Sequence, residues 1–308
     1  MRPFRFGYQL GSDGDSAALR REAQAAEDAG FDVLCSSDHL GSQFSALAPL
    51  AAAAGCTSRI RLCPLVLNND FHHPALLAQE IASLDRLSDG RVELGIGAGH
   101  ASPEYTAAGI TFETPTVRKA RLGESVDILR RLLDGETVTF AGTHYRLEAA
   151  RTLASFQDHL PILVGVNGQA ALSWAAARAD TIGLTMLGRT LPDGQRHEVR
   201  WAPERLDATV DWVNHHAGRH QRNVELNALV QAIVVTNDRQ EAAERLVTNI
   251  AGLTISDALA TPFLALGNHD EITAHILTCR ARWGISYYVV RDIEAFAPVI
   301  ERLRQLET

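Results

Sequence analysis

Short apolar stretches alternate with longer amphipathic ones along most of the chain. Residues 4–10 alternate like a strand, and after a polar turn residues 17–29 have helical spacing that ends at Gly30. The same pair recurs and predicts eight strands that are each followed by a helix. The expected strands are 4–10, 31–36, 60–67, 91–94, 161–165, 180–185, 224–235 and 285–290. The expected helices are 17–29, 45–54, 75–87, 116–133, 168–179, 203–217, 238–250 and 294–306.

This alternation predicts the fold class. Apolar strands that alternate with amphipathic helices form a parallel sheet buried on both faces, and eight such units close a (β/α)8 TIM barrel of the α/β class. An open doubly wound sheet is the alternative architecture. We expect residues 1–308 to form a single domain, because no linker or repeat period interrupts the pattern.

Three segments lie outside the repeat. Residues 137–147 are expected to form a small hairpin insertion, because two short alternating runs flank Ala-Gly-Thr. Residues 187–200 are a polar stretch longer than the usual strand-to-helix connection, and we expect a mobile lid loop there. Residues 271–282 are expected to be irregular.

Composition narrows the possible classes of function. The 308 residues are 46% hydrophobic, which allows a large core, and 29 basic against 37 acidic residues give a net charge of −8. That charge argues against nucleic acid or an anionic membrane as a partner. Four cysteines without a CxxC pair argue against a zinc site and a disulfide framework. No apolar run approaches 18 residues, so we expect a cytoplasmic protein.

Candidate site residues follow the predicted fourth strand, at the end where barrel enzymes bind their ligands. Gly95, Gly97 and Gly99 remove the side chains there, so a flat ligand could lie on the bare backbone. His100 and Glu104 would stand at the rim of that ligand.

Two other predicted strands also end in polar residues. His39 follows the second strand, where a histidine can hold or relay a proton near neutral pH. Asn68, Asn69 and Asp70 follow the third strand and could hydrogen-bond a heteroaromatic ring. Each also has a structural interpretation, as an ordinary loop histidine or as turn residues.

A phosphate site is predicted where a strand passes through glycines into a helix. Gly165 and Gly168 fit this description, because backbone N–H groups and the positive end of the helix dipole would face an anion. A plain tight turn is the alternative. The run from Gly95 to Gly99 is not a dinucleotide fingerprint, since no helix is expected before about residue 116. Hydrolase and kinase motifs and clustered metal ligands are absent from the sequence, which points to an organic cofactor.

Several stretches taken together resemble the luciferase-like oxidoreductases, the bacterial luciferase-like monooxygenase superfamily. The resemblance rests on residues 36–39, 66–74, 78–80, 84–99, 104–105, 161–168, 179–180, 284–290 and 297–298. It implies a (β/α)8 barrel that uses FMN or the deazaflavin coenzyme F420. Residues 66–71 and 185–190 are most similar to the F420-dependent branch.

The resemblance also implies roles for individual residues. His39 matches a histidine that contacts the cofactor ring, and the end of the third strand backs that ring, often through a non-proline cis peptide. The implied cofactor contacts are His39, Leu65, Val66, Asn68, Ala98, Gly99, Val166, Asn167, Gly168, Gln169 and Thr185, of which the last five match the phosphate site. The expected catalytic residues are His39, which the resemblance implies, and His100 and Glu104, whose place at the rim of the site would let them supply a proton; no metal ligand is expected. A related sugar-phosphate dehydrogenase carries an acidic proton donor where this chain has His100, so sugar phosphate is not the expected substrate.

We therefore expect a coenzyme F420-dependent oxidoreductase that transfers a hydride between the deazaflavin and a small organic substrate. An FMN-dependent monooxygenase on the same barrel and a flavin-binding barrel without turnover are the alternatives. The resemblance and the Ala-rich helices at 45–54 and 75–87 also predict a homodimer.

Overall fold

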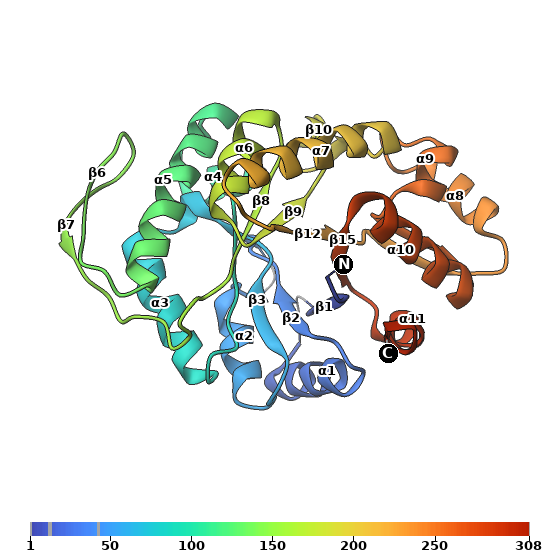
Figure 1. Ribbon diagram of the computed structural model, residues 1–308, viewed down its shortest axis with the longest axis horizontal. Helices are drawn as coiled ribbons and strands as arrows, with labels where there is room; N and C mark the ends of the chain where they lie inside the picture. Colours follow the sequence, from blue (N-terminus) through green and yellow to red (C-terminus); the bar gives the residue numbers. More distant parts are fainter. Residues whose placement is uncertain (1, 12–13, 42–43, 308) are drawn as a thin grey trace.

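A parallel barrel of eight strand positions is formed by the described residues, which are 2–11, 14–41 and 44–307 of a computed structural model (Figure 1). The first and last strands pair with each other, so both ends of the chain belong to one sheet. The barrel strands are β1 (Arg5–Gln9), β2 (Val33–Ser36), β3 (Arg61–Pro64), β4 (Leu67–Asn68), β5 (Leu94–Gly97), β8 (Ile162–Val166), β9 (Thr181–Leu184), β12 (Glu225–Leu229) and β15 (Ile285–Val290). The predicted (β/α)8 barrel is confirmed.

The third strand position is split into β3 and β4. Leu62 bridges to Val92, and Leu67 pairs with Ile96, so both pieces adjoin the same neighbouring segment and complete the circuit. Between them the Leu65–Val66 peptide bond is cis. The predicted continuous strand 60–67 is therefore wrong at its centre, where the chain bulges into the barrel.

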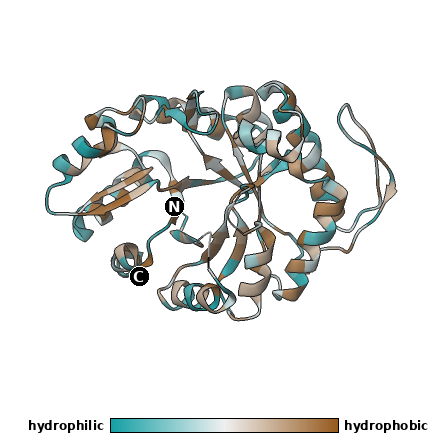
Figure 2. Cartoon of the chain, turned by 180° about the vertical axis from the view of Figure 1, so that it is seen from behind, coloured by the Kyte–Doolittle hydropathy of each residue, from teal (hydrophilic) through white to brown (hydrophobic). Residues whose placement is uncertain are grey.

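Helices surround the barrel, with hydrophilic residues on their outer surfaces (Figure 2). Several of them begin at side-chain caps such as Asp15, which accepts a hydrogen bond from the Ala18 N–H at 2.8 Å. The helices are α1 (Ser16–Asp28), α2 (Leu47–Ala54), α3 (Pro74–Leu87), α5 (Pro115–Leu133), α6 (Gln169–Arg178), α7 (Pro203–Arg219), α10 (His269–Trp283) and α11 (Ile293–Glu307).

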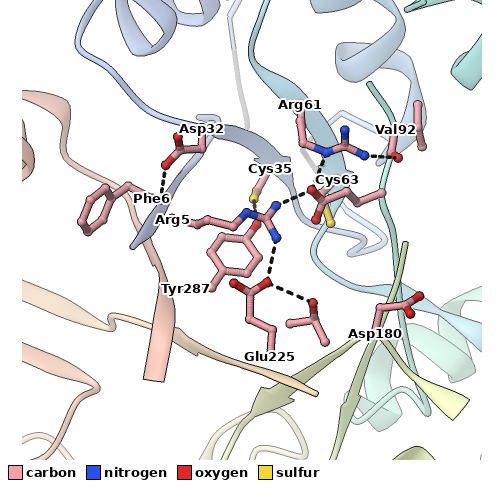
Figure 3. Close-up of polar contacts among 12 residues, drawn as sticks. Arg5, Phe6, Asp32, Cys35, Arg61, Cys63, Val92, Asp180, Glu225 and Tyr287 are labelled. Carbon is pink, nitrogen blue, oxygen red and sulfur yellow. Dashed lines mark hydrogen bonds and ion pairs between the residues drawn. The ribbon is translucent and has the colours of Figure 1, made fainter. Parts of the chain in front are cut away.

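A charged network fills the end of the barrel where the strands begin (Figure 3). Arg5 pairs with Glu225 at 2.7 Å and also with Glu93, which pairs with Arg61 at 2.6 Å. The two glutamates are 2% and 3% exposed, so each carboxylate depends on these partners. Desolvation alone would lower the pKa of Arg5, but the two carboxylates raise it above its usual value. Because these side chains fill the end at which the strands begin, a ligand can enter the barrel only from the opposite end.

Residues 187–200 form a hairpin instead of the predicted loop. β10 (Leu187–Thr190) pairs antiparallel with β11 (His197–Val199). Asp193 accepts backbone hydrogen bonds from residues 195 and 196 and closes the turn. The small predicted insertion is confirmed as β6 (Val138–Ala141) and β7 (Arg146–Ala150), which protrude from the barrel (Figure 1).

The predicted strand 224–235 is wrong, because the chain leaves the barrel in its middle. The Val230 N–H donates to the Val289 carbonyl, whereas the Gln231 N–H donates to the Phe263 carbonyl. The chain then continues as β13 (Ala232–Val235), which pairs with β14 (Leu264–Gly267) in a separate parallel sheet. Two short helices, α8 (Arg239–Val247) and α9 (Ile255–Ala260), lie between these strands in the chain.

Besides α9, two helices lie where the sequence analysis expected none. Residues 271–282, predicted to be irregular, belong to α10, which starts at a capping box formed by Asn268 and Glu271. α4 (Ser102–Ala108) precedes the helix expected at about 116, because Pro103 fits the first helical turn. The capping box was a signal in the sequence that could have identified α10.

Candidate functional site

A cavity of about 580 Å³ lies at the carboxyl ends of the barrel strands, and every strand position contributes to its lining. The predicted site residues that line it are His39, Leu65, Val66, Asn68, Ala98, Gly99, His100, Glu104, Val166, Asn167 and Thr185. Gly168 and Gln169 lie just beyond the lining, at the start of α6. The fold thus brings these residues around one cavity, and their individual roles stay predictions.

The glycines of β5 accommodate the bulge of the third strand, which accounts for them without a ligand, and the interpretation that they clear space for a flat ligand stays a prediction. β5 spans residues 94–97 instead of the predicted 91–94, so Gly95 and Gly97 lie inside the strand. A Cβ atom at Gly95 would overlap the Pro64 carbonyl oxygen, and one at Gly97 would lie 2.8 Å from Val66 Cγ2. Gly97 and Gly99 still line the cavity, but chiefly through backbone that other protein atoms press against.

His39 and Glu104 form a hydrogen-bonded pair at the cavity. The Nδ1 atom of His39 is 2.8 Å from Oε1 of Glu104, whose Oε2 accepts from the Leu40 N–H at 3.3 Å. Glu104 belongs to α4, and its side chain is 12% exposed against 44% for His39. The more buried carboxylate therefore orients the histidine ring.

His100 lies between two other histidines. Its ring centroid is 5.6 Å from that of His39 and 5.3 Å from that of His197 on β11. The ring is exposed to the cavity, yet desolvation by the surrounding protein, together with repulsion from His39 and His197, lowers the pKa of His100 to about 4. His100 is therefore neutral at pH 7.

The turn from β8 into α6 has the features of an anion site. Gly168 has a φ of +86°, and in the described part of the chain no side chain caps this helix start. Lys119 of α5 reaches the turn, where its Nζ donates to the backbone carbonyl of Asn167 at 2.8 Å and to Oδ1 at 3.2 Å. Desolvation and the neighbouring Arg118 lower the pKa of Lys119. An anion there would meet both a helix N-terminus and a cation.

Asn68 and Asp38 hold the end of the third strand. Oδ2 of Asp38 accepts from the Asn68 N–H at 2.8 Å and lies 3.1 Å from Nε2 of His72. The Asn68 side chain accepts from the Tyr105 hydroxyl at 3.0 Å and from the Asp70 N–H at 3.1 Å. Asn68 therefore has a structural role, and its predicted contact with a cofactor ring stays a prediction.

The sequence analysis missed several residues of this cavity. They are Gln9, Lys119, His197, Trp201, Phe263 and Arg291. Lys119 is the only lysine in the chain, which was a visible signal. Arg291 stands two residues after the inward-facing Val289, so the period of two along β15 also indicated its direction. Gln9 ends β1, whereas His197, Trp201 and Phe263 come from a hairpin and from loops whose fold the local pattern did not reveal.

Comparison with known proteins agrees with this architecture. The family of luciferase-like monooxygenases matches residues 1–279. An F420-dependent glucose-6-phosphate dehydrogenase of Nakamurella multipartita is 35% identical over 67% of this chain and 65% of its own length. A 5,10-methylenetetrahydromethanopterin reductase of Archaeoglobus fulgidus is 33% identical over 58% of this chain and 52% of its own length. The chain thus spans between about half and two thirds of the length of these relatives.

Solved structures share the fold across nearly the whole chain. The coenzyme F420 dependent tetrahydromethanopterin reductase from Methanopyrus kandleri has a TM-score of 0.77 at 20% identity, with 98% of this chain and 100% of that chain covered. An F420-dependent secondary alcohol dehydrogenase in complex with an F420-acetone adduct has a TM-score of 0.79 at 20% identity and the same coverage. With the barrel, the cavity and the match over residues 1–279, the chain belongs to the luciferase-like monooxygenase family.

Proposed function

We propose that this protein is a coenzyme F420-dependent oxidoreductase that transfers a hydride between the deazaflavin and a small organic substrate. Family membership and the F420-dependent relatives support this choice. The observation that carries the proposal is a single cavity that combines an uncapped helix start near Lys119 with a hydrogen-bonded pair of His39 and Glu104.

The residues present fit a cofactor with a flat ring and a phosphate. Lys119 and the N–H groups at the start of α6 would hold the phosphate. Leu65 and Val66 present an apolar surface to the cavity, which suits the face of a ring. The sequence-based assignment of Gly168 and Gln169 to the phosphate site is kept as part of this proposal.

A bound deazaflavin supplies the carbon that carries the hydride, so the protein has to orient the substrate and handle a proton. His39, held by Glu104, would donate or accept the proton at the substrate oxygen or nitrogen. His100 is neutral at pH 7, so its role would be hydrogen bonding to the substrate and not donation from a charged imidazolium.

A titration of the cofactor-free protein with F420 and, separately, with FMN tests the proposal. We expect F420 to bind more tightly, and Lys119→Met to weaken that binding by about tenfold, because a charge-assisted hydrogen bond is lost. Since Lys119 is the only lysine, bound F420 should also protect it from an amine-reactive reagent. The exposed Arg59 at the opposite end of the barrel gives a matched charge control, Arg59→Met.

An FMN-dependent monooxygenase is the second candidate, because the matching family is described by monooxygenase activity. Oxygen uptake with reduced FMN, without loss of deazaflavin absorbance when F420 is supplied, would favour it. Binding of either cofactor without any turnover across a panel of substrates would favour a flavin-binding barrel.

We also propose a homodimer, with an interface different from the Ala-rich faces that the sequence suggested. Those faces pack on the barrel, since Ala53 of α2 and Ala78 of α3 are fully buried. The outer face of α3 instead exposes Leu76 at 68% and Leu87 at 75%, eleven residues apart on one side of the helix. Sedimentation should show a dimer that Leu76→Glu converts to a monomer, and a wild-type protein sedimenting only as a ~33.5 kDa species would reject it.

The remaining proposals concern location and partners. We propose a cytoplasmic protein of one domain, residues 1–308, that does not bind nucleic acid, as its net charge of −8 suggests. Within residues 2–11, 14–41 and 44–307, none of the helices has the length and apolar character required to cross a membrane.

A further inference from the structure

One wall of the cavity has no role in the proposed cofactor site. The proposed cofactor contacts lie on or follow β2, β3, β4, β5, β8 and β9, which leaves β12, β15 and β1 as neighbouring strands on the other side. The inward-facing residues of these three strands and of the segments that follow them include a polar set around Val289 and Leu229. This set consists of Gln9, Asn227, Gln231 and Arg291.

Arg291 is the cation of this wall. Its Nε atom donates to Oε1 of Gln9 at 3.1 Å, and Gln9 is a neutral partner. In residues 2–11, 14–41 and 44–307 no carboxylate forms an ion pair with Arg291, because the adjacent Asp292 instead accepts a hydrogen bond from the Ala295 N–H at 2.9 Å; desolvation lowers the pKa of Arg291. The side chain is exposed at the open mouth and stays charged at pH 7. Its Nη1 and Nη2 edge is available to a planar anion.

The other charged groups around the cavity are already engaged. Lys119 is assigned to the cofactor phosphate in the proposed function, and Arg196 pairs with Asp193 at 2.5 Å. Asp38 lies against His72, and Glu104 against His39. An anion that enters the cavity beside the cofactor would therefore find its unpaired positive partner at Arg291.

The surroundings of this cation also limit the rest of the ligand. Trp201 and Phe263 line the cavity with ring centroids 5.2 Å apart, and both rings are almost fully buried. The Gln231 N–H donates to the Phe263 carbonyl at 2.7 Å, which puts the aromatic pair beside the polar set. A ligand that uses both features has a charged end and an apolar body.

We propose that the substrate is a small organic carboxylate, held at its charged end by Arg291 and packed through its apolar part against Trp201 and Phe263. A carboxylate is a planar monoanion that one guanidinium can bind through two parallel hydrogen bonds. A phosphate monoester carries about two negative charges at pH 7 and would be expected to use a second cation, for which this wall offers only neutral amides. The claim that this carboxylate is the substrate rests on the proposed function. Its binding at Arg291 can be measured separately.

Calorimetric titration of the full-length protein, with and without F420, provides the test. The probes are 3-phenylpropionate, its neutral amide and phenyl phosphate. We expect the acid to bind at least tenfold more tightly than the amide. Arg291→Gln should weaken acid binding by about 10- to 100-fold and leave amide binding unchanged, because a charge-assisted pair is lost. Arg59→Gln, at the other end of the barrel, should change neither.

Several results would overturn the inference. They are equal affinity for acid and amide, no binding of the acid at 10 mM, an unchanged acid affinity in Arg291→Gln, or tighter binding of phenyl phosphate that depends on Arg291. If circular dichroism shows that Arg291→Gln is unfolded, Arg291→Lys replaces it in the titration. Lysine keeps the positive charge but lacks the planar guanidinium, so this variant should bind the acid at least threefold more weakly than the wild type. Normal F420 binding without acid selectivity rejects this inference alone, and acid selectivity without F420 binding rejects only the proposed function.

Discussion

Replacing Gly95 with alanine tests whether the glycines of β5 serve the bulge of the third strand. The added Cβ atom would stand well inside 3.0 Å of the Pro64 carbonyl oxygen, with the Pro64 carbonyl carbon at 3.2 Å and Cys63 Sγ at 3.3 Å. Two of these three atoms are backbone, and all lie in the barrel interior. Rotation of a side chain therefore cannot relieve the overlap, and β3 and β5 would have to separate.

The expected cost is large for the addition of one methyl group. Forcing extra atoms into a packed interior costs about 1–3 kcal/mol where side chains can adjust. Because the Pro64 backbone cannot, we expect Gly95→Ala to lower the free energy of unfolding by about 3 kcal/mol or more. Gly165→Ala is the matched control, since its Cβ would meet Val66 methyl groups at 3.4 and 3.5 Å, which is ordinary contact. That variant is expected to be neutral or slightly stabilising, because alanine restricts the unfolded chain.

Urea unfolding followed by tryptophan fluorescence, at one fixed protein concentration, measures the difference. The physical reasoning is refuted if the two variants unfold at the same midpoint with the same slope. A Gly95→Ala protein of normal stability that has lost F420 affinity would instead support the original interpretation, in which glycine clears space for the ligand.

Three further predictions concern single side chains. His39→Ala should keep the fold and most of the F420 affinity and lower kcat by about 10²–10⁴-fold, and a normal kcat in a deazaflavin absorbance assay would make this histidine structural. The ring of His100 should titrate near pH 4 by NMR, and at higher pH in His39→Ala because one repelling histidine is gone. A wild-type midpoint near the ordinary 6.5 would contradict the explanation by desolvation and repulsion. Asp85→Ala should lower the free energy of unfolding by about 3 kcal/mol, because this fully buried carboxylate accepts four hydrogen bonds from residues 92, 156 and 157. The exposed Asp134→Ala should cost less than about 1 kcal/mol in the same urea assay.

The sequence by itself determined the barrel and the end at which its cavity lies. Strands and helices bury their residues with periods of two and 3.6, so the order of elements can be read locally, and β8 and α6 follow the predicted pattern closely. Parallel strands bring their carboxyl ends to one rim, which is why His39 and Glu104, 65 residues apart, could be assigned to one site.

The tertiary structure decided what each residue at that rim contacts. Gly95 is explained only by the carbonyl of Pro64, which is remote in sequence, and no period within β5 encodes that contact. The hairpin at 187–200 and the departure of the chain at Val230 depend on backbone partners elsewhere in the fold. Arg291 is distinguished by its place at the cavity, where its hydrogen-bond partner is the neutral Gln9 and not a carboxylate. Such differences in partner arise from packing between distant segments, whereas local sequence determines only which way a side chain points.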